Sequence, residues 1–75
     1  MALSIISYTI DTHYDEDATF IFRAVAEHFN CHVKINFSVD GSKAEAILIG
    51  LPCDILTVEK ESEELGVDFR REEVE

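Results

Sequence analysis

Residues 11–17 read DTHYDED, a dense group of chemically reactive side-chain types. Carboxylates beside an imidazole and a phenol can bind a cation, exchange protons or, at the histidine, accept a phosphoryl group. The same composition is also typical of the charged beginning of a helix. The surrounding sequence has to decide between these possibilities.

Two of the possible chemistries fail when the segment is compared with the motif that each one needs. Carboxylate or imidazole side chains occupy every second position from Asp11 to Asp17, as the first ligands of a calcium-binding EF-hand loop do. However, Glu16 replaces the required glycine and Phe22 replaces the bidentate glutamate. His13 precedes a helix in a position similar to that of the phosphorylated histidine in the phosphocarrier protein of the sugar phosphotransferase system. That family continues His-x-Arg-Pro, whereas three acids follow His13 here and would repel a phosphate.

The three adjacent acids are explained by a helix that we expect over residues 16–29. Acidic side chains at a helix start interact favourably with the free N–H groups and the macrodipole, by ~0.3–1 kcal/mol each, and Asp15 or Asp17 can act as the N-cap. Asp11, His13 and Tyr14 are left without a structural role, so they are the candidates for function in this loop.

A second group of potential ligands consists of His28, Cys31, His32 and Cys53. Two imidazoles and two thiolates can form a tetrahedral zinc site. The segment HFNCH matches no recognised zinc spacing, so zinc binding is a distant alternative and we predict no metal or cofactor. The sequence also contains no glycine-rich phosphate loop, nucleophile elbow or Cys-x-x-Cys motif. We therefore do not expect an enzyme.

The charge of the chain excludes two classes of partner. Its 75 residues include 6 basic and 16 acidic ones, which give a formal net charge of −10. Such a field repels phosphate backbones and anionic bilayers, so we expect neither direct nucleic-acid binding nor membrane binding. The first ten residues lack a secretory signal, and the two cysteines indicate free thiols in a reducing compartment. These features predict a cytoplasmic protein.

Half of the acidic residues lie in the last part of the chain, residues 59–75, where only Lys60, Arg70 and Arg71 oppose them. An acidic flank of this kind usually keeps a protein soluble, and less often it docks on a basic partner. The predicted acidic surface consists of Glu59, Glu61, Glu63, Glu64, Glu72 and Glu73.

Hydrophobic periodicity and turn residues predict six elements in one domain, residues 1–75. They are a strand at 3–10, a helix at 16–29, strands at 32–39 and 42–50, a helix at 53–66 and a strand at 67–70, followed by a frayed acidic tail at 71–75. Residues 54–58 alone could instead form a strand. With right-handed crossovers, the order β-α-β-β-α-β predicts an α+β, two-layer ferredoxin-like sandwich, in which two helices cover one face of a four-stranded antiparallel sheet.

Each predicted helix has an expected boundary and an apolar stripe. In the first helix, the stripe consists of Ala18, Ile21, Phe22, Val25 and Phe29, and Asn30 is the expected stop. In the second helix, we expect Asp54 as the cap, Gly66 as the stop, and inward-facing side chains at Ile55, Val58 and Leu65.

The two middle strands have a predictable register. Val33, Ile35, Phe37 and Val39 alternate with polar residues and should form one buried face. The dipeptide at 40–41, Asp-Gly, predicts a two-residue type I′ turn, which pairs Val33 with Leu48 and His32 with Ile49.

This register turns several aliphatic side chains away from the helices, and the first strand adds to them if Ile6 and Tyr8 are buried. Large aliphatic residues on an uncovered sheet face often mark an interaction surface. The predicted partner-binding residues are Leu3, Ile5, His32, Lys34, Ile47 and Ile49.

Two functions are consistent with these patterns. The first is a small regulatory or adaptor domain that binds protein through the open sheet face, as a homodimer or on a larger partner. The second is an acidic decoy that occupies the basic groove of a nucleic-acid enzyme, as small viral inhibitors do. Binding of a decoy should weaken steeply with salt, whereas an apolar interface should change little. Metal binding is a more distant third possibility.

Overall fold

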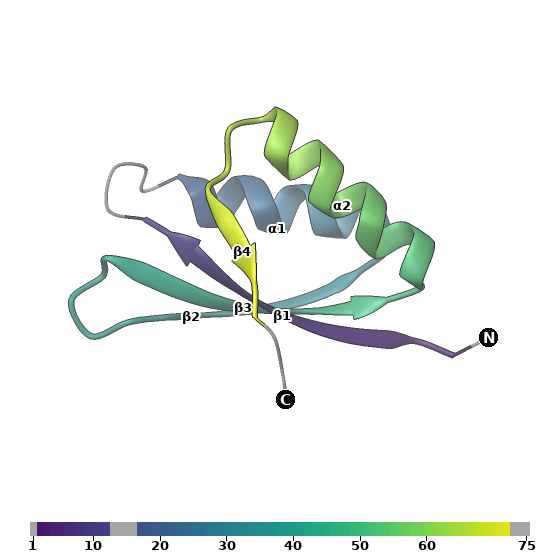
Figure 1. Cartoon of the computed structure of the whole chain (residues 1–75), viewed down its shortest axis with the longest axis horizontal. Coiled ribbons are helices and arrows are strands. Elements are labelled where there is room, and N and C mark those ends of the chain that lie inside the picture. Colours follow the sequence, from purple (N-terminus) through teal and green to yellow (C-terminus); the bar gives the residue numbers. More distant parts are fainter. Residues whose placement is uncertain (1, 13–16, 73–75) are drawn as a thin grey trace.

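The computed structural model describes residues 2–12 and 17–72 of the chain. Its elements, in chain order, are β1 (Ser4–Asp11), α1 (Ala18–His28), β2 (His32–Phe37), β3 (Lys43–Gly50), α2 (Pro52–Glu64) and β4 (Phe69–Arg71). The strands form one sheet in the order β2-β3-β1-β4, and every neighbouring pair is antiparallel. Both helices lie on the same side of this sheet (Figure 1). The predicted ferredoxin-like sandwich is therefore confirmed.

The central strand β1 separates the two faces of the sheet. Tyr8 and Ile10 are completely buried beneath the helices, and they pair with Ala46 and Ala44 of β3, which are also buried. Because side chains alternate along a strand, Ile5, Ser7 and Thr9 point to the opposite face. Leu3 and Ile5 were expected on the uncovered side if Ile6 and Tyr8 are buried; Tyr8 is completely buried and Ile6 packs partly buried against the core.

The register between β2 and β3 is the predicted one, from His32 opposite Ile49 to Phe37 opposite Ala44. The predicted turn is wrong, because Asp40 has no positive φ, whereas a type I′ turn needs one at both central residues. Instead, the backbone N–H of Ser38 donates to the carbonyl of Lys43 over 2.8 Å and closes a four-residue loop. A loop that is two residues longer keeps the same pairing.

Asp40 holds this loop together through its side chain. Its carboxylate accepts hydrogen bonds from the backbone N–H of Ser42 at 3.0 Å and from the hydroxyls of Ser38 and Ser42 at 2.8 Å each. These donors, the backbone one first, lower the pKa of Asp40 to about 2. The side chain thus makes a local turn that does not require a left-handed aspartate.

The buried face of β2 is shorter than predicted. Val33 and Ile35 pack partly buried against the core, but Phe37 is 60% exposed and Val39 is fully exposed. Val39 belongs to the loop, because β2 ends at Phe37. Strand alternation therefore predicted the correct face of the sheet for Phe37. It did not predict how little of Phe37 the helices cover.

The first helix begins two residues later than predicted, at Ala18, with Asp17 as its N-cap residue. Its first turn therefore contains no acidic residue, and the Asp17 side chain makes no capping hydrogen bond. Asp15 and Glu16 lie outside the described residues. The predicted stripe is confirmed: Ala18, Phe22 and Val25 are buried, while Ile21 and Phe29 pack partly buried against them.

The element that follows β3 is a helix, and the alternative of a strand at 54–58 is wrong. Its N-cap residue is Leu51, with Pro52 in the first turn, so Asp54 lies inside the helix and does not cap it. Ile55 and Val58 face the core as predicted. Leu65 does not: it is 58% exposed, because the helix ends at Glu64 and the chain turns outward there.

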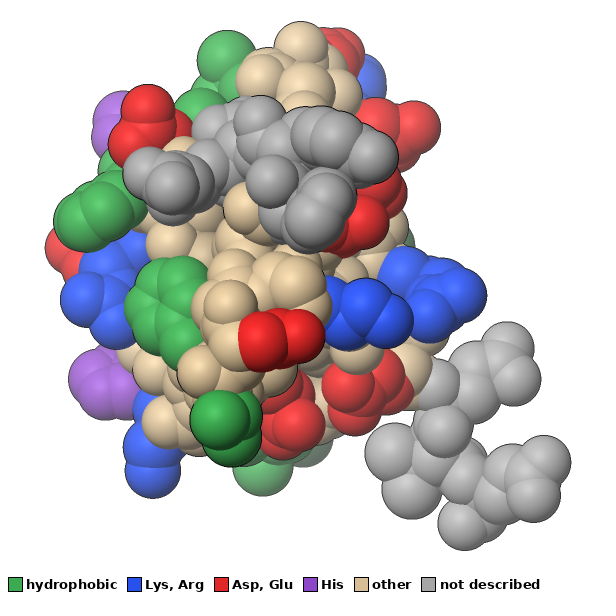
Figure 2. Space-filling view, turned by 90° about the vertical axis from the view of Figure 1, so that its left-hand side faces the viewer, with side chains coloured by type: hydrophobic (Ala, Val, Ile, Leu, Met, Phe, Trp, Pro, Cys, Tyr) green, Lys and Arg blue, Asp and Glu red, His purple; other side chains and the backbone are tan. Residues whose placement is uncertain are grey.

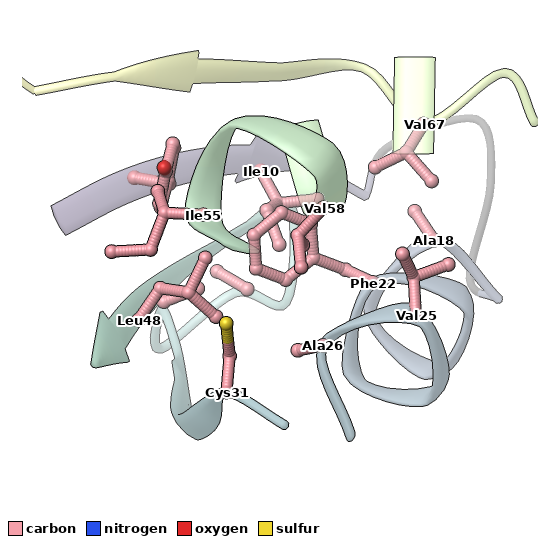
Figure 3. Close-up of a cluster of buried hydrophobic side chains, with 13 residues drawn as sticks. Ile10, Ala18, Phe22, Val25, Ala26, Cys31, Leu48, Ile55, Val58 and Val67 are labelled. Atoms are coloured by element: carbon pink, nitrogen blue, oxygen red, sulfur yellow. The ribbon is translucent and has the colours of Figure 1, made fainter. Parts of the chain in front are cut away.

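Both helices end in the same Schellman motif. Asn30, with a φ of 61°, and Gly66, with a φ of 85°, adopt the left-handed conformation directly after the C-cap residue. The next N–H reaches back to the last turn, from Cys31 to the carbonyl of Ala26 and from Val67 to that of Ser62. Cys31 and Val67 then enter the core, where they lie among the helix and strand side chains (Figure 3).

The end of the chain is more ordered than predicted. Val67 belongs to the helix-terminating motif, and β4 spans Phe69–Arg71, later than the expected strand at 67–70. Arg71 pairs with Tyr8, and the N–H of Glu72 donates to the carbonyl of Ser7 over 2.9 Å. The predicted frayed tail therefore does not include residues 71 and 72, and residues 73–75 lie outside the described part of the chain.

We predict that Gly66→Ala lowers the free energy of unfolding by about 1–2 kcal/mol, because L-residues are strained at its φ of 85°. A Cβ at this position would meet no atom within 4 Å, so the cost is that of the backbone alone. Urea unfolding followed by circular dichroism measures the change. Asn30→Gly is the control and should cause no comparable loss. An unchanged stability of Gly66→Ala would contradict the left-handed assignment.

A substitution of Ser62 should have the opposite effect on the free energy of unfolding. It is completely buried in α2, and its hydroxyl has no hydrogen-bond partner within residues 2–12 and 17–72. We expect Ser62→Ala to raise the free energy of unfolding by about 1 kcal/mol, since an unpaired buried hydroxyl is destabilising. Thr12→Val is the matched control, because the Thr12 hydroxyl donates to the carbonyl of Gly41 at 2.6 Å and its loss should destabilise. A Ser62→Ala protein of lower stability would contradict the unpaired state.

Candidate protein-binding face

The sheet has one face that no helix covers, and we call it the open sheet face (Figure 1). Strand alternation and the observed pairing determine which side chains belong to it. Among the described residues it consists of Leu3, Ile5, Ser7, Thr9, Asp11, His32, Lys34, Asn36, Lys43, Glu45, Ile47, Ile49, Asp68, Arg70 and Glu72. All six predicted partner-binding residues thus lie on one surface, and their role in binding stays a prediction.

One end of the open sheet face is apolar. Ile5 of β1 and Ile49 of β3 are direct cross-strand neighbours, and Ile47 is the next residue of β3 on this face. Directly opposed side chains in antiparallel strands have Cβ atoms about 4.5–5.5 Å apart, so these isoleucines form a continuous patch. Leu3 extends it, and Leu3 and Ile5 are 63% and 67% exposed. His32 and Lys34 border the patch on β2.

The other end of the open sheet face is polar. Here Asn36, Glu45, Thr9 and Arg70 lie side by side across the four strands. The Thr9 hydroxyl donates to the carboxylate of Glu72 at 2.7 Å, which holds Glu72 against the sheet. Two open hollows of about 250 and 240 Å³ are found at this end, and Thr9 and Lys43 line both. They are smaller and shallower than most small-molecule sites.

The charges of the open sheet face nearly balance one another. Among the described residues, three basic ones lie on it, Lys34, Lys43 and Arg70, against four acidic ones, Asp11, Glu45, Asp68 and Glu72. The other described positions include three basic and eight acidic residues, so most of the described excess of negative charge lies off this face. This face can approach another protein without the repulsion that the overall charge would suggest.

The predicted acidic surface is not one surface in the structure. Glu59, Glu61, Glu63 and Glu64 belong to α2, whereas Glu72 lies on the open sheet face. Glu63 and Glu64 are exposed, and Glu61 is half-buried beside α1. Glu73 lies outside the described residues. Viewed from the end that carries the β2–β3 loop, acidic and basic side chains are mixed (Figure 2).

Glu59 takes part in a polar cluster that the sequence analysis missed. Its carboxylate accepts hydrogen bonds from the hydroxyl of Tyr8 and from the guanidinium of Arg71. Burial, followed by the nearby Glu59 carboxylate, raises the pKa of Tyr8 well above its usual value. The same carboxylate raises the pKa of Arg71. The three residues come from β1, α2 and β4, so only the folded chain brings them together.

The cluster has the properties of a structural tie. The ring of Tyr8 packs edge-on against Phe22 and Phe69, with centroids 5.4 and 5.7 Å apart. A phenol with a raised pKa stays protonated at neutral pH and can only donate to the carboxylate beside it. The tie connects the central strand with α2 and with β4.

The loop candidates are divided by the structure. Asp11 is the last residue of β1, where it pairs with Lys43, so it is a strand residue and not a loop residue. Its N–H donates to the carbonyl of Asp68 over 2.9 Å. His13 and Tyr14 lie outside the described residues.

The four candidate zinc ligands do not form a metal site. Across residues 2–12 and 17–72, no three His, Cys, Asp or Glu side chains are placed so that they could hold a metal ion. Cys31 is buried, and desolvation, followed by the charge of Asp54, raises the pKa of its thiol. A Cβ on Gly50 would lie 2.7 Å from its sulfur, which explains the glycine opposite it. Cys53 is exposed on α2.

Exposed aromatic residues at the edge strand form a second feature that the sequence analysis did not identify. Phe20 of α1 is 71% exposed and Phe37 of β2 is 60% exposed. Both line a small hollow of about 100 Å³ together with Thr19, Arg23 and Ile35. Phe20 lies outside the apolar stripe of α1, and this position in the sequence could have indicated that its side chain is exposed.

Comparisons with known proteins find no family model that matches the chain and no match among curated proteins. Within the described part of the chain, no helix is both long and apolar enough to cross a membrane. The function must therefore be inferred from the surface itself.

We predict that Tyr8→Phe lowers the free energy of unfolding by about 2 kcal/mol, because it removes a hydrogen bond to a charged acceptor. The raised pKa of Tyr8 also has a consequence at high pH. Above pH ~10 the unfolded chain loses the phenolic proton while the folded chain keeps it, so stability should fall as the pH rises. Urea unfolding from pH 7 to 11 measures both effects. A Tyr8→Phe protein with the same stability and the same alkaline decline as the native one would contradict the tie.

Proposed function

We propose that this chain is a small, cytoplasmic, non-enzymatic adaptor or regulatory domain that binds a protein partner through the open sheet face. The observation behind the proposal is the patch formed on an uncovered sheet by Leu3 and Ile5, which are exposed, and by Ile47 and Ile49, which are half-buried. Monomeric soluble proteins rarely expose continuous apolar patches without a function. A domain of 75 residues also buries little surface and benefits from docking.

The surroundings of the patch support a protein partner. Interfaces commonly have an apolar centre and a polar rim. Here His32 and Lys34 border the isoleucines on one side, and Thr9, Glu45 and Arg70 continue the face at the polar end. The nearly balanced charge of this face allows a partner to approach without strong electrostatic selection.

The decoy alternative receives less support from the arrangement of the acids. A decoy of nucleic acid needs negative charges in succession along one surface, to match a basic groove. Glu59 is paired with Arg71, Glu61 is half-buried, and Glu72 lies on the other layer of the molecule. Glu63 and Glu64 remain as exposed acids of the predicted set on α2.

The double variant Ile47→Thr/Ile49→Thr should lose the bound partner, because it removes the apolar centre while threonine keeps a high β-propensity. The tagged protein is used to capture partners from soluble lysate at low and high salt, and the mass of the resulting complex is measured. Leu56→Thr is the matched control, since Leu56 is 61% exposed on α2 and lies off the face.

We expect the native protein and Leu56→Thr to form complexes of the same mass at both salt concentrations, and the double variant to form none. Circular dichroism checks that all three proteins are folded. Unchanged capture by the double variant would contradict the proposal. Capture that disappears at high salt for the native protein would favour the decoy instead.

A further inference from the structure

The side chains of the open sheet face are arranged in rows across the four strands. Tyr8 pairs with Arg71, and the N–H of Glu72 donates to the carbonyl of Ser7, so Glu72 lies opposite Ser7. Ser7 in turn pairs with Ile47, and Ile47 with Lys34. One row therefore has a cation at the β2 edge, an anion at the β4 edge and an uncharged centre.

Rotation about a two-fold axis parallel to the strands places each row of one copy over the same row of the other copy, with the strands in the reverse order. If a second sheet is placed face to face with the first about such an axis, Lys34 of one copy lies over Glu72 of the other, and the reverse contact forms as well. Aligned sheets pack about 10 Å apart with strand directions within about 30°, so side chains from the two rows meet. The two ion pairs lie at opposite rims of the contact.

The neighbouring rows match under the same rotation. In the apolar row, Ile49 of one copy lies over Ile5 of the other. In the last row, Lys43 lies over Asp11. In the remaining row, Glu45 lies over Thr9 and Asn36 over Arg70, so polar groups meet polar groups there.

The alternative axis, perpendicular to the strands, gives a poor match. It would place the apolar row of one copy over the row of Lys43 and Asp11 in the other, and Ile47 over Glu45. Isoleucine would then cover charged groups, which would lose water without gaining an opposite charge from the other copy. The pattern of the face thus favours one orientation.

We infer that the occupant of the open sheet face is a second copy of this chain, packed face to face about a two-fold axis parallel to the strands, with Lys34 of each copy paired to Glu72 of the other. The inference rests on the proposed function and specifies its partner. A chain with a net charge of −10 associates with itself most easily through a surface that is not strongly acidic, and the open sheet face carries three basic and four acidic described residues. Charges elsewhere are separated by more than the sheet spacing and are screened within about 8–10 Å at physiological salt.

The carboxylate of Glu72 is available for this contact. One of its oxygens accepts the hydroxyl of Thr9 at 2.7 Å within the same chain, and a carboxylate has further acceptor positions. Lys34 and Glu72 are both exposed at the two edges of the sheet.

Charge reversal tests the pairing. Lys34→Glu places two acids together at both rims, and Glu72→Lys places two cations together. We expect each single variant to raise the dimer dissociation constant about tenfold, as two rim ion pairs become two repulsions. The double variant Lys34→Glu/Glu72→Lys re-forms the pairs with reversed sign and should return within about threefold of the native value.

Sedimentation equilibrium on the purified full chain measures the dissociation constants. Lys60→Glu and Glu64→Lys are the matched controls, because they make the same charge changes at exposed positions of α2. Glu72→Lys and the double variant both lose the Thr9 hydrogen bond, so recovery in the double variant separates the intermolecular pair from that local effect. Circular dichroism checks the fold of each protein.

Three results would overturn the inference. They are a native protein that stays monomeric at every concentration, a double variant that does not recover, and control variants that weaken the dimer as much as Lys34→Glu does. A monomer that still loses its lysate partner on Ile47→Thr/Ile49→Thr would leave the proposed function in place with a different partner. A dimer unaffected by either set of variants would contradict both.

Discussion

The alternation of side chains along β1 and β3 is the constraint on which the rest of the structure depends. Because these central strands pair in register, Tyr8, Ile10 and Leu48 are completely buried beneath the helices. The same two-residue period sends Ile5 and Ile49 to the uncovered face. A slip of one residue would exchange the two sets, so the core and the candidate interface are determined together.

The space above the sheet is shaped by small residues on β3. Ala44 and Ala46 lie between larger neighbours on β1 and β2, and this leaves room for side chains from both helices. Phe22 fills part of that room beside the ring of Tyr8. The Schellman motifs then return the chain to the core at Cys31 and Val67, so each helix has a defined end as well as a buried side.

The distribution of charge gives the two layers different properties. Most acids that the structure describes lie off the open sheet face, and that face has three basic and four acidic residues. The helices carry more acidic than basic residues, whereas the charge of the sheet face is nearly balanced. An acidic composition alone suggests a partner with a basic surface. We propose instead a partner that matches an apolar, nearly neutral face, and a second copy of the chain has such a face.

The sequence by itself determined the order of the elements, the pairing of β2 with β3 and the side to which each strand residue points, because these depend on local periods of 2 and 3.6 residues. It could also place six partner-binding candidates on one face. Contacts between segments that are distant along the chain could not be predicted from the sequence. The pairing of Tyr8 with Glu59 and Arg71, the separation of Glu72 from the acids of α2 and the exposure of Phe37 and Leu65 depend on how far the helices extend over the sheet. Only tertiary packing decides that extent, since no local pattern encodes it.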